Sequence, residues 1–129
     1  RLSQRETRRS MKADKFGATA KGRKKPGSMN KTEEAYFRYL KLRDDVDVIE
    51  FEKTAFRLAE RCSYTPDFMV MLKDGEVQFH EVKGSKAIFQ DDAKVKIKVA
   101  AGMVPFRFFV VFPSKTKKGE WDLEEVKRG

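Results

Sequence analysis

Apolar residues recur with helical spacing near position 30 of the chain. Tyr36 and Leu40 lie four residues apart and follow Glu33, which predicts a helix with one apolar face. Asn30 is a favourable N-cap, and Glu33 three residues later completes the reciprocal capping arrangement. The helix is therefore expected to begin near Asn30, with Glu33 on or beside the buried face and Glu34 in water.

Four further segments show strand or helix patterns. Positions 46–51 alternate and predict a strand, and positions 56–58 either continue that strand or pair with it. Positions 90–103 predict a second helix, and the apolar run at 106–112 is typical of a central strand buried on both faces. A last short element is expected around Trp121. This order of elements predicts an α/β fold in which a mixed central β-sheet is flanked by helices.

A β-hairpin is predicted over residues 67–83, with Asp74-Gly75 at its tip. If these two residues alone formed the loop, Asp67 would lie on the opposite face of the hairpin from Glu81. A three-residue loop with a left-handed Gly75 would instead place Asp67 directly opposite Glu81. Apolar pairing is acceptable in both registers, so the pattern leaves the choice open. A site that contains both carboxylates requires the second register.

The predicted hairpin also carries the residues with the clearest chemical meaning. Glu81 and Lys83 alternate with Val82, so both point to one face of their strand. With Asp67 and the Val82 carbonyl, Glu81 would form an oxygen pocket suited to Mg²⁺, with Mn²⁺ as a substitute. Lys83 would position a water molecule, help to deprotonate it, or neutralise charge that develops on a phosphoryl group. Short carboxylate patterns are weak alone, but their conjunction with an inward Glu33 favours a metal-dependent site.

Positive charge is concentrated at the start of the chain. The net charge is +9, of which residues 1–29 carry +8 and residues 30–129 carry +1. The first segment has no apolar periodicity, so it is expected to be disordered alone and to order on a polyanion such as DNA. A solubilising tail is the alternative. The predicted organisation is thus a basic arm over 1–29 followed by one folded domain over 30–129.

Composition narrows the remaining function classes. No apolar run is long enough to span a membrane, and no signal peptide is visible. Cys62 is the only cysteine, which rules out an internal disulfide and suits a reducing cytoplasm. With one cysteine and one histidine, a structural zinc site of the Cys/His type is nearly excluded, so any metal is expected to be held by oxygen.

Several motifs resemble those of known nucleases. The Pro-Asp at 66–67, followed by Glu-Val-Lys at 81–83, resembles the signature of the PD-(D/E)XK nuclease superfamily. Over residues 30–113, Tyr-Thr-Pro-Asp-Phe, Glu-Val-Lys-Gly and Asp-Asp-Ala-Lys (91–94) resemble the bacteriophage endonuclease I family of Holliday-junction-resolving enzymes. The long basic arm departs from that family.

The resemblance implies a restriction-endonuclease-like fold and Mg²⁺-dependent cleavage of branched DNA. The setting would be phage or prophage recombination or replication in the cytoplasm of a bacterial host. Its implied catalytic set is Glu33, Asp67, Glu81 and Lys83, with Glu33, Asp67, Glu81 and the Val82 carbonyl at the metal. It also implies a homodimer, often intertwined. An intertwined dimer would allow Glu33 to face Asp67 of the other subunit. Two alternatives stay open: a general nicking or restriction-like endonuclease, and a catalytically inactive DNA-binding accessory protein.

Other polar residues have two interpretations at this point. His80 alternates away from Glu81, which favours a structural or solvated role. The aromatic residues at 106–109 are expected in the core rather than as base-stacking platforms. Basic residues outside the hairpin either face solvent or contact phosphates, and the candidates for DNA binding are Lys94, Lys96, Lys98, Lys115, Lys117, Arg23, Lys24 and Lys25.

Overall fold

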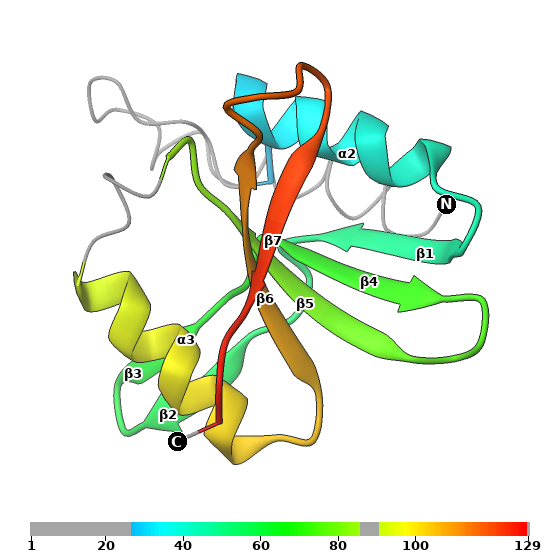
Figure 1. The fold of residues 1–129 in the computed structure, drawn as a ribbon. Coiled ribbons are helices and arrows are strands. Elements are labelled where there is room, and N and C mark those ends of the chain that lie inside the picture. The colour runs from blue at the N-terminus through cyan, green and yellow to red at the C-terminus, as the bar shows by residue number, and fades with distance from the viewer. Residues whose placement is uncertain (1–26, 86–90, 129) are drawn as a thin grey trace.

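The structure, a computed structural model, describes residues 27–85 and 91–128 (Figure 1). Its helices are α2 (Lys31–Leu42) and α3 (Asp91–Met103), and neither is long and apolar enough to cross a membrane. Five strands form one sheet in the order β1-β4-β5-β6-β7. Their bounds are Val46–Phe51 for β1, Phe68–Leu72 for β4, Val77–Val82 for β5, Arg107–Pro113 for β6 and Trp121–Glu125 for β7. The predicted α/β class and mixed sheet are confirmed.

Helix α2 begins where the capping pattern predicts. Asn30 Oδ1 accepts a hydrogen bond from the Glu33 backbone N–H at 2.8 Å, and Glu33 Oε1 accepts one from the Asn30 N–H at 2.9 Å. Tyr36 and Leu40 are fully buried, whereas Glu34 is exposed. The apolar face and the different environments of the two glutamates are therefore confirmed.

The β4–β5 hairpin turns through three residues. Gly75 has a left-handed φ of 97°, a conformation that glycine adopts without steric cost. Its N–H donates to the Leu72 carbonyl at 2.9 Å, and the Leu72 N–H donates to the Glu76 carbonyl at 2.8 Å. Continued along the two strands, this register sets Asp67 opposite Glu81. Of the two registers that the sequence left open, the observed one gathers the carboxylates.

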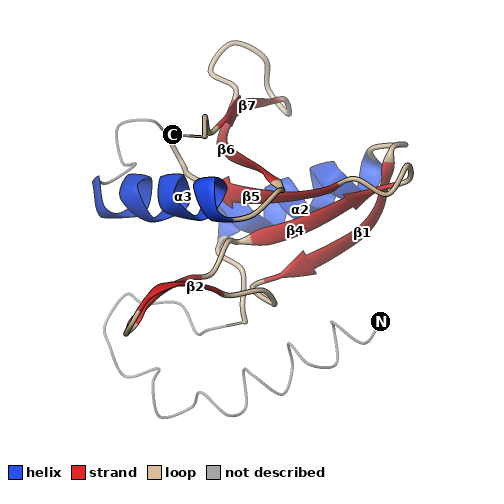
Figure 2. Cartoon of the chain, turned by 90° about the horizontal axis from the view of Figure 1, so that it is seen from below, coloured by secondary structure: helices blue, strands red, loops and turns tan. Residues whose placement is uncertain are grey.

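The two helices cover opposite faces of the sheet (Figure 2). Helix α2 packs with Phe68 and Val82, and α3 packs with Phe79. Residues 108–112 of β6 are all buried and alternate between the two apolar clusters. Strand β6 is parallel to β5, and α3 forms the crossover between them, as the continuous apolar run predicted.

The segment after β1 departs from expectation. Strand β2 (Phe56–Ala59) neither continues β1 nor pairs with it, but forms a separate hairpin with β3 (Cys62–Tyr64) that packs beside α3 (Figure 1). Strand β1 pairs with β4 instead. Glu52 adopts a φ of 52° directly after the last residue of β1 and turns the chain out of the sheet.

Two boundaries also differ from the predictions. Phe106 was expected in the core, but it precedes β6 and 37% of it is exposed. The folded unit already includes residues before 30, because the Gly27 N–H donates to Glu52 Oε1 at 3.0 Å and Met29 packs against the core on the α2 side. Residues 27–29 are therefore part of the described fold.

His80 has the structural role that its alternation favoured. Gln78 Nε2 donates to Glu76 Oε2, so Gln78 Oε1 is the acceptor for His80 Nε2 at 3.0 Å. His80 Nδ1 then accepts from the Tyr36 hydroxyl at 2.6 Å. Burial lowers the pKa of His80 to about 3, so the ring is neutral near neutral pH and orients Tyr36.

Candidate functional site

Carboxylates gather at one end of the sheet. Strands β1 and β5 are antiparallel to β4, so their C-terminal ends lie beside the start of β4. Glu52 follows β1, Asp67 precedes β4, and Glu81 is the penultimate residue of β5; the Glu52 N–H donates to the Asp67 carbonyl at 2.9 Å. The first turn of α2 adds Glu33. They line a pocket of about 420 Å³ together with Asn30, Thr32, Val82, Lys83 and Gly84.

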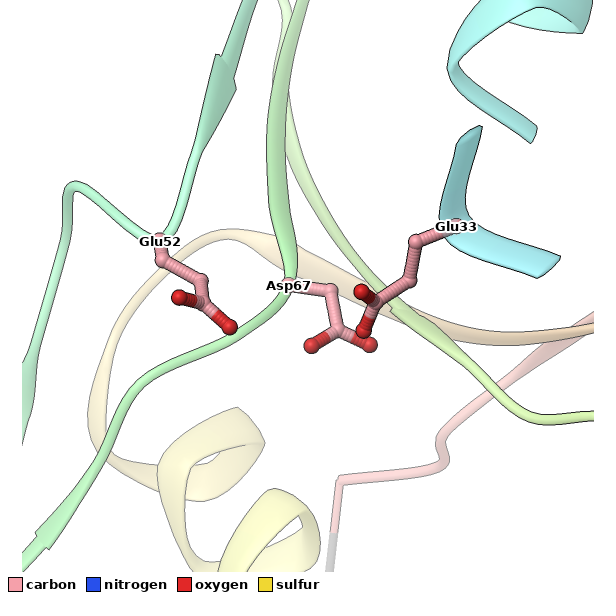
Figure 3. Close-up of side chains that lie close together, drawn as sticks. All are labelled: Glu33, Glu52 and Asp67. Atoms are coloured by element: carbon pink, nitrogen blue, oxygen red, sulfur yellow. The ribbon is translucent and has the colours of Figure 1, made fainter. Parts of the chain in front are cut away.

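Three of these carboxylates form a compact trio. One oxygen each from Glu33, Glu52 and Asp67 lies within 4.8 Å of the others, and Figure 3 shows the three side chains converging. Glu33 is 4% exposed and Asp67 is 8% exposed, whereas Glu52 is half-buried. A cation that accepts oxygen ligands would match this donor set.

The Asp67 carboxylate is held in a fixed orientation. Its Oδ2 accepts a hydrogen bond from the Val82 backbone N–H at 2.8 Å. Burial, followed by the negative charges of Glu81 and Glu33, raises the pKa of Asp67 well above its usual value. The folded chain thus keeps a carboxyl group among like charges, and a divalent cation would offset that repulsion.

Glu81 stands beside the trio and has partners of its own. The Tyr64 hydroxyl donates to Glu81 Oε1 at 2.7 Å, and Lys83 Nζ lies 3.4 Å from Glu81 Oε2. Burial raises the pKa of Glu81, while the Tyr64 hydrogen bond and the Lys83 charge oppose that rise. Burial and the Glu81 charge also raise the pKa of the Tyr64 phenol, which keeps it protonated as a donor.

The four predicted catalytic residues, Glu33, Asp67, Glu81 and Lys83, all line this pocket. Val82 lines it as well and supplies the N–H that orients Asp67. Glu33 reaches Asp67 of the same chain, so the grouping needs no residue from a second subunit. The closest set of oxygen donors differs from the expected one, since Glu52 belongs to it and Glu81 does not.

The predicted DNA-contacting lysines lie away from the pocket walls. Lys94 and Lys98 are exposed on α3 and Lys96 is half-buried there, while Lys115 and Lys117 are exposed between β6 and β7. None of these five lines the carboxylate pocket. Arg23, Lys24 and Lys25 lie outside the described residues.

Sequence reasoning missed Glu52 and gave Tyr64 no role. Glu52 directly follows a predicted strand, and alternation puts it on the face opposite Phe51, but that signal acquires meaning only once β1 is known to pair with β4. Its left-handed backbone is sparsely populated by residues other than glycine, and such conformations cluster at functional sites. Both observations support a role for Glu52 in the pocket.

Comparison of the chain with protein-family models, with curated proteins and with solved structures found no match. The interpretation of the site therefore rests on its geometry and on the motif resemblance in the sequence.

Glu33 and Glu34 provide a matched pair of variants within one helix. If the pocket catalyses metal-dependent DNA cleavage, as the motif resemblance implies, Glu33→Gln should slow that reaction by roughly 10- to 100-fold, the loss typical of removing a group that supports a metal site. The helix should still form, because the amide oxygen of Gln can accept the Asn30 hydrogen bond. Glu34→Gln changes an exposed carboxylate in the same turn and should be nearly silent. Single-turnover rates compare the two, and the reverse ranking would remove Glu33 from the site.

Proposed function

We propose that this protein is a metal-dependent endodeoxyribonuclease that hydrolyses phosphodiester bonds. One observation carries the proposal: Asp67, Glu81 and Lys83, spaced as in PD-(D/E)XK nucleases, meet Glu33 in one pocket. The three-residue turn at Gly75 is what brings Asp67 and Glu81 together. A restriction-endonuclease-like fold is part of the same proposal, supported by a mixed sheet with a helix on each face.

The residues present fit Mg²⁺ or Mn²⁺. Glu33, Glu52 and Asp67 offer hard oxygen donors within 4.8 Å of one another, and Glu81 lines the same pocket. When bound, such a cation lowers the pKa of water and polarises a phosphoryl oxygen. Burial, followed by the negative charges of Glu81 and Glu33, raises the pKa of Asp67, and a divalent cation would compensate this negative charge.

The remaining residues have distinct tasks in this proposal. Lys83 lies 3.4 Å from Glu81 Oε2, where its ammonium group can orient the attacking water and neutralise charge that develops on the phosphoryl group. Tyr64 is a positioning residue, because its hydroxyl holds Glu81 by a 2.7 Å hydrogen bond. The Val82 N–H does the same for Asp67. These contacts hold the charged groups in place before substrate binds.

Branched DNA is the proposed substrate, with a four-way junction as its leading form. The support is the resemblance of residues 30–113 to the phage endonuclease I family, and it implies a role in phage or prophage recombination or replication within a bacterial host's cytoplasm. A cleavage assay that compares a four-way junction, a linear duplex and a single strand, each with and without Mg²⁺, tests the proposal. Cleavage of the junction alone is expected, and equal cleavage of linear duplex would indicate a general nicking enzyme. No cleavage of any substrate would favour an inactive DNA-binding protein.

A two-fold homodimer would place two such sites on a junction of approximate two-fold symmetry. Helix α3 offers an apolar stripe for this contact, because Val95, Val99 and Met103 recur every four residues and are 61%, 41% and 51% exposed. Val99→Lys should convert the dimer to a monomer in sedimentation experiments. Leu42→Lys, a matched change at an apolar residue that is 83% exposed on α2, should leave the dimer intact. A wild-type chain that is monomeric at micromolar concentration and fully active on junctions would contradict the proposal.

The basic arm is expected to act through salt-dependent contacts with phosphates. Residues 1–26 hold ten basic and two acidic residues, and each phosphate they neutralise should add about −0.9 to the slope of log K against log salt. Deleting 1–26 keeps Gly27 and its bond to Glu52, so the chemical step at saturating protein should survive. Binding should weaken and its salt slope should flatten. An unchanged slope would make the arm a solubilising tail.

A further inference from the structure

A second hollow lies beside the carboxylate pocket. It is a groove of about 650 Å³ between α2 and the β6–β7 segment, which lie next to one another in Figure 1. Thr32 lines both the groove and the carboxylate pocket, so both hollows reach the first turn of α2. The groove and the carboxylate pocket are therefore neighbours along α2.

Two aromatic rings form part of the groove wall. Tyr39 and Trp121 are half-buried, and their ring centroids are 6.3 Å apart. Both contact the fully buried Tyr36, whose ring centroid is 5.6 Å from that of Tyr39 and 4.9 Å from that of Trp121. The hydrogen bond from Tyr36 to His80 fixes this support. The exposed parts of Tyr39 and Trp121 are thus held in place before any ligand arrives.

Basic side chains surround these rings. Lys31, Arg38 and Lys118 line the groove and are exposed, against a single carboxylate from Glu120. The wall itself is mainly apolar. Aromatic faces flanked by cations suit an unpaired nucleic-acid strand, whose bases stack on rings while its phosphates meet positive charge. An acidic peptide would pair with the cations, but its carboxylates would not stack on the two partly exposed rings.

We infer that the groove binds a short single-stranded stretch of nucleic acid, with a base on Tyr39 and Trp121 and phosphates at Lys31, Arg38 and Lys118. The inference rests on the proposed function only in taking DNA as the substrate. It adds that the protein engages unpaired nucleotides next to the bond it cuts. Substrates with a single-stranded arm at the branch should therefore be preferred over fully paired ones.

Trp121 provides a direct readout, because it is the only tryptophan in the chain. An oligothymidylate of about eight nucleotides, within the length that such a groove binds, should quench its fluorescence in EDTA, where no cleavage interferes. A blunt duplex and polyglutamate should quench little at equal charge. Equal quenching by polyglutamate would contradict the stacking of bases on Trp121 and overturn the inference. A fluorescence change that depends on protein concentration alone would instead assign the groove to a second copy of the chain.

Matched variants separate stacking from charge. Tyr39→Leu should weaken binding of the oligothymidylate by roughly 5- to 100-fold, and Tyr39→Phe, which keeps the ring, should restore it. Arg38→Gln should weaken binding and flatten its salt dependence, whereas Arg57→Gln, an exposed cation on β2, should do neither. Wild-type affinity in Tyr39→Leu would overturn the inference.

Failure of this inference and failure of the nuclease proposal give different results. A chain that binds oligothymidylate in EDTA but cuts no DNA with Mg²⁺ would defeat the nuclease proposal and leave the groove assignment standing. A chain that cuts four-way junctions but shows no quenching, and whose Tyr39→Leu variant cuts forked and blunt junctions in the same ratio as the wild type, would defeat the groove assignment alone.

Discussion

Asp67→Asn should reduce the rate of DNA cleavage by at least about 10³-fold, since losing one preorganised group already costs about 10²- to 10³-fold. Asp67 belongs to the compact carboxylate trio and lies opposite Glu81, so the substitution removes negative charge where a divalent cation would bind. DNA binding should stay intact or become tighter, because a carboxylate near the phosphates no longer repels them. Glu81→Gln should act in the same direction.

The fold should survive this change, which makes the result interpretable. The amide oxygen of Asn can still accept the Val82 N–H. Burial and neighbouring carboxylates raise the pKa of Asp67, so a neutral side chain should leave the Tm in EDTA unchanged or higher. Asp47→Asn, an exposed carboxylate on β1, serves as the matched control and should cut at the wild-type rate. Wild-type cleavage by Asp67→Asn in Mg²⁺ would refute the site.

Lys83→Gln should slow the single-turnover rate by about 10²- to 10³-fold, because its charge acts mainly on charge that develops during phosphoryl transfer. The variant should also need a higher pH for its residual activity. Burial raises the pKa of Glu81, and the Lys83 charge opposes that rise. Without Lys83 the pKa of Glu81 rises further, so the ionised form of Glu81 is reached at higher pH.

Lys73→Gln is the control for this prediction, since Lys73 is exposed in the β4–β5 turn far along the hairpin from Lys83. Both variants remove one positive charge, so a general electrostatic effect on DNA binding would appear in both. An equal loss of rate in the two variants, or no loss in Lys83→Gln, would remove Lys83 from the chemical step.

Short-range sequence patterns predicted the helix start, the strand faces and the hairpin that carry Glu33, Glu81 and Lys83. The Asn30 cap and the spacing of Tyr36 and Leu40 set the start and the buried face of α2, which orients Glu33. Strand alternation put Glu81 and Lys83 on one face. The turn at Gly75 offered two registers with similar apolar pairing, so hydrophobicity could not choose between them, although glycine allowed the left-handed conformation that was observed.

The site residues that the sequence did not predict reach the pocket through contacts between segments far apart in the chain. Strand β1 pairs with β4 across an intervening β2–β3 hairpin, and no local pattern encodes that choice. Glu52 enters the site only through this pairing, and its left-handed backbone is unusual for glutamate. Tyr64 reaches Glu81 because β3 returns the chain toward the start of β4. Contacts of this kind depend on the assembled fold.

The central claim is that Glu33, Glu52 and Asp67 hold a divalent cation that the chemistry needs. Calorimetric titration of the full chain with Mn²⁺ tests it most directly, because it measures binding without DNA or turnover. Wild type and Asp47→Asn should bind Mn²⁺ with the same affinity, and Asp67→Asn should lose most of that binding. Equal Mn²⁺ affinity in wild type and Asp67→Asn, or no binding by the wild-type chain, would contradict the claim.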